Sequence, residues 1–165
     1  MSHPSLLLVT GLPGTGKTTF AKALAKHLGA KHLNTDVIRT EMGLRGQYDQ
    51  ATKEKVYQAL EERTQHFLAD DRTVVVDGTF YLRKLRATYQ RLAAAKACPI
   101  RWFVVEAPEV LVQQRMQQQR AYSEADFEVY QKIKEQWEPF EGGAVAIPTG
   151  PIQHMLTTAM RHLPT

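Results

Sequence analysis

The sequence predicts an α/β fold in which a five-stranded parallel sheet carries helices on both faces. Short apolar runs rich in β-branched residues alternate with longer segments of helical periodicity, an arrangement typical of βαβ units. The runs are continuously apolar, as in the three valines at 74–76, which is expected for strands covered on both sides. With 165 residues, of which 43% are apolar, the chain is expected to form a single domain over residues 1–165.

The elements follow from two periodicities. Strands are expected at the apolar runs 5–9, 31–34, 73–77, 100–106 and 144–147. Helices are expected where apolar residues recur every three or four positions: 17–28, 50–69, 82–97, 108–119, 123–138 and about 151–163. Two of these helices meet near paired arginines, and we expect the segment at about 115–138 to form a helical lid that closes over a bound nucleotide.

The composition favours a protein of a reducing compartment. Cys98 is the single cysteine, so no internal disulfide can form, and no His/Cys cluster has metal-ligand spacing. The apolar run at residues 6–9 is too short for a signal-peptide core or a membrane span, and we expect a cytoplasmic protein. The formal net charge of +4 is compatible with an anionic ligand but is too small to argue for nucleic acid by itself.

Residues 11–18 read GLPGTGKT and match the phosphate-binding loop G-x-x-x-x-G-K-[ST]. The motif lies between an apolar strand and a helix, where backbone N–H groups and the helix dipole can bind phosphates. We predict ATP as the cofactor, with the Lys17 ammonium against the β- and γ-phosphates, the Thr18 hydroxyl on Mg²⁺ and Thr19 at the α-phosphate. The predicted nucleotide-binding residues of the loop are Gly14, Thr15, Gly16, Lys17, Thr18 and Thr19.

The remaining motifs favour a small kinase over other P-loop proteins. The guanine-reading N/T-K-x-D and the switch D-x-x-G of common GTPases do not occur in the sequence. Motor and AAA+ ATPases need a longer chain and an acid pair after the third strand, whereas Asp77 is followed by Gly78.

The predicted acceptor side begins at Asp36, which follows the second strand. Ligands bind at the carboxyl ends of parallel strands, so this carboxylate is predicted to be the general base that takes the proton of an attacking hydroxyl. The alternative is that Asp36 only caps the helix that follows. Arg39, one helical turn later, is predicted to bind an anionic group of the acceptor, with a surface salt bridge as the alternative.

The end of the third strand supplies a second set of candidates. Asp77 is predicted to hold Mg²⁺ through a bound water, with helix capping as the alternative, and Thr79 is predicted to hydrogen-bond to the acceptor. Arg83, in the first turn of the next helix, is unfavourable against the helix dipole. It is therefore a candidate for substrate binding, although a solvated helix face explains it as well.

The expected lid contains Arg115 and Arg120. A guanidinium suits the spread charge of a transferring phosphoryl group, so we predict that at least one of these arginines is catalytic after closure, and that Arg120 also contacts the nucleotide. A structural or solvated role is the alternative for each. Ser123 begins a capping motif that opens the second lid helix.

Together the segments GLPGTGKTTFA, NTDVIR, VVVDGTF, RMQQQR and SEADFEVY resemble the small P-loop kinases of the polynucleotide 5′-kinase type, over about residues 6–137. The resemblance implies a core like that of adenylate kinase, Asp36 as general base, Arg39 on the acceptor phosphate and a lid arginine on the transferred phosphate. The spacing of Arg115 and Arg120 departs from the family pattern, which leaves the choice between them open. The family also phosphorylates sugars, antibiotics and other hydroxyl compounds, so the acceptor does not carry over.

Three functions follow from these patterns. The leading one is a Mg²⁺- and ATP-dependent phosphotransferase that moves the γ-phosphoryl group to a hydroxyl, either a polynucleotide 5′-hydroxyl or a small molecule. A nucleotide-gated ATPase or regulatory module without an acceptor is the alternative, and it has no need of Asp36. A nucleic-acid-binding protein with a secondary nucleotide site is disfavoured because the sequence has no basic stripe interleaved with aromatic residues.

Overall fold

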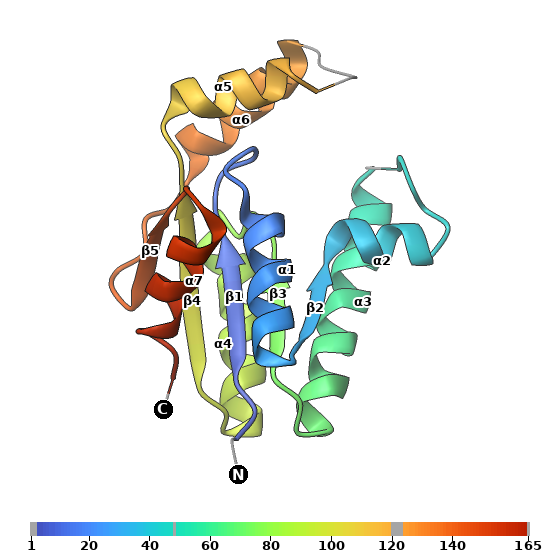
Figure 1. The fold of residues 1–165 in the computed structure, drawn as a ribbon. Helices are drawn as coiled ribbons and strands as arrows, with labels where there is room; N and C mark the ends of the chain where they lie inside the picture. Colours follow the sequence, from blue (N-terminus) through green and yellow to red (C-terminus); the bar gives the residue numbers. More distant parts are fainter. Residues whose placement is uncertain (1–2, 48, 120–123, 165) are drawn as a thin grey trace.

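The computed structural model describes residues 3–47, 49–119 and 124–164 (Figure 1), and for residues 124 and 125 only the backbone. A five-stranded sheet forms its centre, as the sequence predicts. The strands are β1 (Leu6–Thr10), β2 (Lys31–Asn34), β3 (Val74–Asp77), β4 (Ile100–Glu106) and β5 (Ala144–Pro148). Their order is β2-β3-β1-β4-β5, and every neighbouring pair is parallel.

The helices of the described chain are α1 (Lys17–Leu28), α2 (Thr35–Glu41), α3 (Gln50–Ala69), α4 (Arg83–Lys96), α5 (Glu109–Gln117), α6 (Glu124–Gln136) and α7 (Ile152–Met160). The expected helix starts at 108 and 151 are one residue early, because Pro108 and Pro151 have extended ψ angles and occupy N-cap positions. Ala97 ends α4 with a left-handed φ of 54°. Ser123, the predicted cap of α6, lies outside the described residues.

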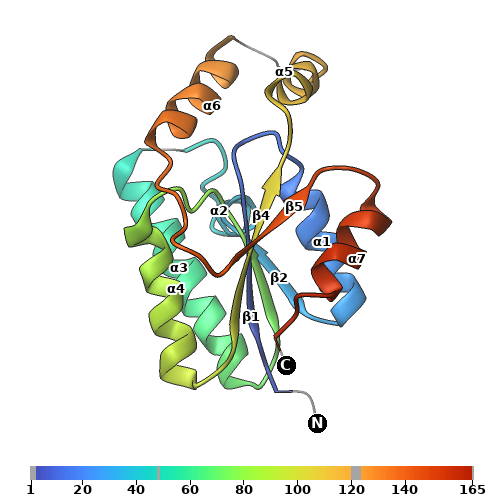
Figure 2. The same ribbon diagram turned by 90° about the vertical axis from the view of Figure 1, so that its left-hand side faces the viewer.

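Two hydrophobic layers fix the sheet between its helices (Figure 2). On one face, α3 and α4 cover alternate strand residues through Val56, Leu60, Leu68, Tyr89 and Ala93. On the other face, α1 and α7 cover the remaining strand residues through Phe20, Leu24, Met155, Leu156 and Ala159. Because all strand residues of β1 and β3 are buried, the continuous apolar runs of the sequence have their physical explanation.

β1 lies at the point where the chain order of the sheet reverses. It pairs with β3 on one side and β4 on the other, and ligands of such sheets bind beyond the carboxyl ends of the strands at this point. The helices α5 and α6 lie above that edge (Figure 1), and Val112, Met116 and Tyr130 form their own small core with Leu12 of the loop after β1. Within the described ranges, no helix has the length and apolar character needed to cross a membrane.

Candidate active site

The loop between β1 and α1 adopts a conformation that its glycines permit. Gly14 and Gly16 have φ angles of 79° and 94°, in the left-handed region that favours glycine. A Cβ atom on Gly14 would lie 2.9 Å from Cγ1 of Val112 on α5, so this glycine also lets α5 approach the loop. The buried Thr15 hydroxyl donates a hydrogen bond to the Leu12 carbonyl at 2.8 Å. The side chain of Thr15 thus shapes the loop.

Lys17 and Thr18, the first residues of α1, face the end of β3. The Thr18 hydroxyl donates a hydrogen bond to Oδ1 of Asp77 at 2.9 Å. Burial lowers the pKa of the Lys17 ammonium, and the nearby carboxylates of Asp77 and Asp36 partly oppose that shift. An ammonium group at this place can pair with phosphate oxygens.

Asp77 is only 3% exposed, and β2 supplies two partners for it. Nε2 of His32 contacts Oδ2, and Nδ2 of Asn34 lies 3.4 Å from the same oxygen. Because Oδ2 is occupied, Oδ1 is left to face Thr18. Asp77 does not cap α4, whose N-cap is Leu82.

His32 is a functional candidate that the sequence reasoning missed. His32 and Asn34 are two positions apart on β2, so they lie on the same face of the strand, and the pairing of Asn34 with Asp77 brings that face to the carboxylate. Strand order, which the sequence pattern does not give, makes this neighbour visible.

The oxygens of Thr18 and Asp77 fit a Mg²⁺ ion. A hydroxyl and a carboxylate are the hard donors that this cation takes, and it usually completes its shell with phosphate oxygens and water. Within the described residues, no three His, Cys, Asp or Glu side chains gather into an all-protein metal centre.

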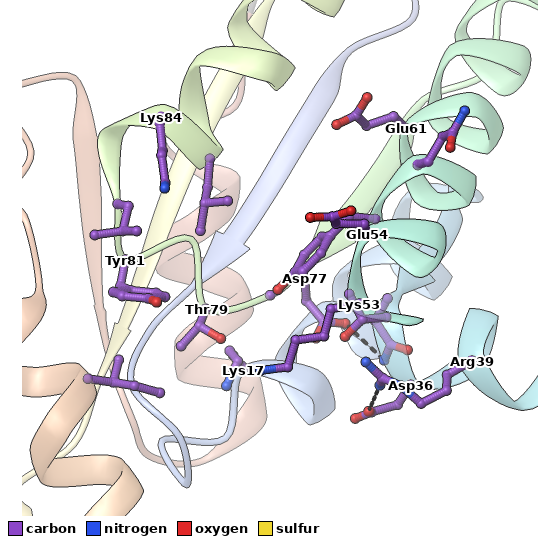
Figure 3. Close-up of a pocket in the computed structure, with 18 of the residues that line it drawn as sticks. Lys17, Asp36, Arg39, Lys53, Glu54, Glu61, Asp77, Thr79, Tyr81 and Lys84 are labelled. Atoms are coloured by element: carbon purple, nitrogen blue, oxygen red, sulfur yellow. Dashed lines mark hydrogen bonds and ion pairs between the residues drawn. The ribbon is translucent and has the colours of Figure 1, made fainter. Parts of the chain in front are cut away.

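A cavity of about 820 Å³ opens in front of Lys17 and Asp77 (Figure 3). Its walls come from α2, α3, the β3–α4 connection, α4 and α6. Lys17, Asp36, Asp77 and Thr79 all line it, so the structure brings the predicted loop, base and acceptor residues to one space.

Asp36 lies in the first turn of α2 with a side chain that is 81% exposed. Asn34 is the N-cap of this helix and accepts a hydrogen bond from the Val37 N–H at 2.8 Å, so the carboxylate of Asp36 is not used as a cap. One oxygen pairs with Nη1 of Arg39 at 3.1 Å. The side chain of Arg39 is buried, and its Nε donates to the Gln47 carbonyl at 3.1 Å.

Helix α3 contributes a face of polar residues that the sequence reasoning did not single out. Residues 50, 53, 54, 57, 58 and 61 of this helix all line the cavity. Their spacing of three and four residues is the signal that would have identified a common face. They oppose Tyr81, Leu82, Lys84 and Leu85, while Val129 and Ile133 of α6 complete the wall.

Arg83 does not line this cavity. Its guanidinium pairs with Glu141 at 3.0 Å and is 56% exposed. Arg86, one turn later, is 3% exposed and donates hydrogen bonds to the carbonyls of Phe80, Tyr81 and Glu138. Arg86 thus links the segment after α6, at Glu138, to the β3–α4 connection.

Arg115 lies on the other side of the phosphate loop. Its guanidinium donates hydrogen bonds to the Gly14 carbonyl at 3.2 Å and to the Thr149 hydroxyl at 3.1 Å. A separate cavity of about 410 Å³ is lined by Arg115, Gly16, Thr19 and the turn after β5 at Thr149 and Gly150. Thr19 therefore opens onto this side, and Arg120 lies outside the described residues.

Comparison with known families gives one match, to the family described as "AAA domain", over residues 6–140. The uncharacterized protein Rv2004c of Mycobacterium tuberculosis is 37% identical over 101 residues, which are 54% of this chain and 20% of that protein. The chain thus aligns with about a fifth of the length of the curated relatives it matches.

Solved structures of kinases share the fold. The APS kinase CysC of Mycobacterium tuberculosis, in complex with AMPPNP and APS, has a TM-score of 0.77 at 16% identity over 98% of both chains. A gluconokinase from Sinorhizobium meliloti has a TM-score of 0.70 at 19% identity, covering 98% of this chain and 94% of that one. A chain of the Pnkp1/Rnl/Hen1 RNA repair complex has a TM-score of 0.63 at 22% identity, covering 84% of this chain and 47% of that one. At these identities the likeness is one of fold, a kinase-like P-loop NTPase fold.

Proposed function

This chain belongs to the family described as "AAA domain", and from that premise we propose that it is an ATP-dependent phosphotransferase with a hydroxyl acceptor. The observation that carries the proposal is the convergence of Lys17, Asp77 and an exposed Asp36 carboxylate on one cavity. A nucleotide site needs only Lys17 and Asp77. Asp36 adds a solvent-exposed proton acceptor on the side where a second substrate would lie.

In this proposal the phosphate loop holds the triphosphate. Backbone N–H groups at Gly14–Gly16 and the start of α1 surround the phosphates, and Lys17 neutralises the β- and γ-phosphate oxygens. Thr18 and Asp77 hold Mg²⁺, which supplies charge neutralisation at the phosphates. His32 fixes Oδ2 of Asp77, and so orients the metal-binding carboxylate.

Phosphoryl transfer then needs an acceptor hydroxyl beside Asp36. The carboxylate takes the hydroxyl proton while the acceptor oxygen bonds to the γ-phosphorus and the bond to the bridging oxygen of ADP breaks. Arg39 pairs with Asp36 and so orients the carboxylate. Thr79, on the cavity wall, is positioned to hydrogen-bond to the acceptor.

The lid contributes differently at its two arginines. The contacts of Arg115 with Gly14 and Thr149 support a role in holding the phosphate loop and the nucleoside end of ATP. This leaves Arg120 as the candidate for charge neutralisation at the transferring group, a role that a guanidinium performs well.

A transfer assay with γ-³²P-labelled ATP and Mg²⁺ tests the proposal. The acceptors are a 5′-hydroxyl oligonucleotide, nucleosides, sugars and aminoglycosides, and the products are separated from inorganic phosphate. We expect label on one acceptor class with the wild type and none with Lys17→Ala. Release of inorganic phosphate only, unchanged by any acceptor, would support an ATPase or regulatory module instead.

A further inference from the structure

Glu61 lies at the far end of the acceptor cavity, and this inference about its partner rests on the proposed function. Glu61 follows Tyr57 by one helical turn and Glu54 by two on α3, and all three line the cavity. In Figure 3, Glu54 and Glu61 extend from α3 into the space that faces Lys84 and Tyr81. At 1.5 Å per residue, Glu61 lies about 10 Å beyond Glu54 along the helix axis.

The Glu61 carboxylate is half-buried, and no described side chain or backbone group donates a hydrogen bond to it. Burial raises the pKa of this carboxyl, Arg91 on α4 opposes the shift, and the neighbouring Glu62 adds to it. A carboxylate accepts several hydrogen bonds, and this one lines the cavity, where a ligand can reach it. A ligand that donates hydrogen bonds would supply what the protein does not.

A second polar group close to Glu61, which does not itself line the cavity, is also unpaired. The side chain of Tyr89 is 2% exposed, and its hydroxyl is buried without a hydrogen-bond partner. Burial raises its pKa strongly, and the charges of Glu61 and Tyr57 add to the shift. Tyr57 in turn is close enough to Asp36 and Arg39 for their charges to affect its own pKa. Tyr57 therefore connects the reacting end of the cavity with the end at Glu61.

The charges along the cavity argue against a strand of phosphates. Apart from Lys17 and Asp77, which serve the nucleotide, the lining has three cations and three carboxylates: Arg39, Lys53, Lys84, Asp36, Glu54 and Glu61. Channels for single-stranded nucleic acid are cationic along the backbone path. Here the inner end of the path is a carboxylate, which repels phosphodiesters and accepts hydrogen bonds from hydroxyl or ammonium groups.

We propose that the acceptor is a small polyhydroxylated molecule, with or without amino groups, whose end remote from the reacting hydroxyl donates hydrogen bonds to Glu61. The 5′ end of a polynucleotide is excluded by this assignment.

The experiment compares Glu61→Gln with Asp70→Asn as the matched control, because Asp70 is an exposed carboxylate at the C-cap of the same helix and does not line this cavity. Three probes are used with Mg²⁺ and ATP: neamine as a two-ring amine-bearing polyol, maltose as its neutral counterpart, and a 5′-hydroxyl oligonucleotide. The readouts are KM for each probe, kcat, and the Kd of a non-hydrolysable ATP analogue from calorimetry.

We expect phosphorylation of neamine or maltose and none of the oligonucleotide. Glu61→Gln should raise the KM for an amine-bearing acceptor about tenfold, since a charge-assisted hydrogen bond is lost, and that for a neutral one less, because the Gln carbonyl still accepts. The KM values of Asp70→Asn and the Kd of the ATP analogue in both variants should equal those of the wild type.

Phosphorylation of the oligonucleotide, equal KM values in Glu61→Gln and wild type, or failure of both polyols with an enzyme that binds the analogue would each overturn the inference. Failure of the wild type to bind the ATP analogue would instead contradict the proposed function.

Discussion

The side chain of Asp36 is exposed to solvent, and its Oδ1 accepts a hydrogen bond from Nη1 of Arg39. The proposed role as general base predicts that Asp36→Asn lowers kcat about 10²- to 10⁴-fold, while the Kd of an ATP analogue stays the same. Asp70→Asn, at the exposed end of α3, is the control. Near-normal turnover of Asp36→Asn would remove the residue from the chemistry.

Glu61 allows a test of pH dependence that needs no substrate. Burial and Glu62 raise its folded-state pKa, and Arg91 lowers it only in part. The folded state therefore favours the protonated carboxyl. The contribution of Glu61 to the free energy of unfolding is complete below the ordinary carboxyl pKa, and it is lost as the pH rises through the raised pKa. Glu61→Gln should match the wild-type Tm near pH 4 and exceed it at pH 7. A lower Tm of the variant at pH 7 would show that the ionised carboxylate stabilises the fold.

At the scale of elements, periodicity alone predicted the five strands and the long helices to within one or two residues. The three consecutive valines at 74–76 indicate a buried strand, and the apolar residues that recur every three or four positions in α1 indicate an amphipathic helix. The two patterns are easy to tell apart because they differ in period. The contacts that complete the site were not predictable. His32 reaches Asp77 only because β2 and β3 are neighbours, and the inward direction of Arg86 depends on how α4 rotates against the sheet.

The position of α5 determines which role we expect for Arg115. Its guanidinium contacts the outer side of the phosphate loop and Thr149, not the cavity that contains Asp36. Arg115→Ala should therefore raise the KM for ATP about tenfold and change kcat by less than about threefold, the pattern of lost ground-state binding. Steady-state kinetics at saturating acceptor measure both constants. A hundredfold fall in kcat at unchanged KM would place Arg115 on the transferring group instead.

One buried guanidinium, that of Arg86, links the segment after α6 to the β3–α4 connection. Arg86 donates to three carbonyls and lies 3.8 Å from the ring centroid of Phe140. Arg86→Ala leaves these acceptors unsatisfied, and we expect a loss of about 3 kcal/mol of unfolding free energy. Arg83→Ala, which removes only an exposed ion pair with Glu141, should cost less than about 0.5 kcal/mol. Equal midpoints of urea unfolding for the two variants would contradict the proposed stabilising role of Arg86.

At the scale of the whole molecule, the carboxyl edge of the sheet collects groups that come from distant parts of the chain. The loop after β1, the end of β3 and the start of α2 meet there, and α5 and α6 lie above them (Figure 1). Lys17 and the Asp77 carboxylate lie at this edge and act on each other electrostatically. A triphosphate with Mg²⁺ would contact groups from all of these segments, so binding should stabilise the entire domain.

The last prediction follows from this coupling. A ligand at a hundred times its Kd stabilises the folded state by about 2.7 kcal/mol, and a domain of this size gains roughly 2–4 °C in Tm per kcal/mol. Mg²⁺ with ATP should therefore raise the wild-type Tm by about 5–10 °C. Lys17→Ala should fold, because it removes a cation that burial disfavours, yet show little of the shift. Lys22→Ala, an exposed lysine on the same helix, should keep it. Scanning calorimetry with and without nucleotide measures all three, and an equal shift in Lys17→Ala and wild type would mean that the phosphate loop does not hold the nucleotide.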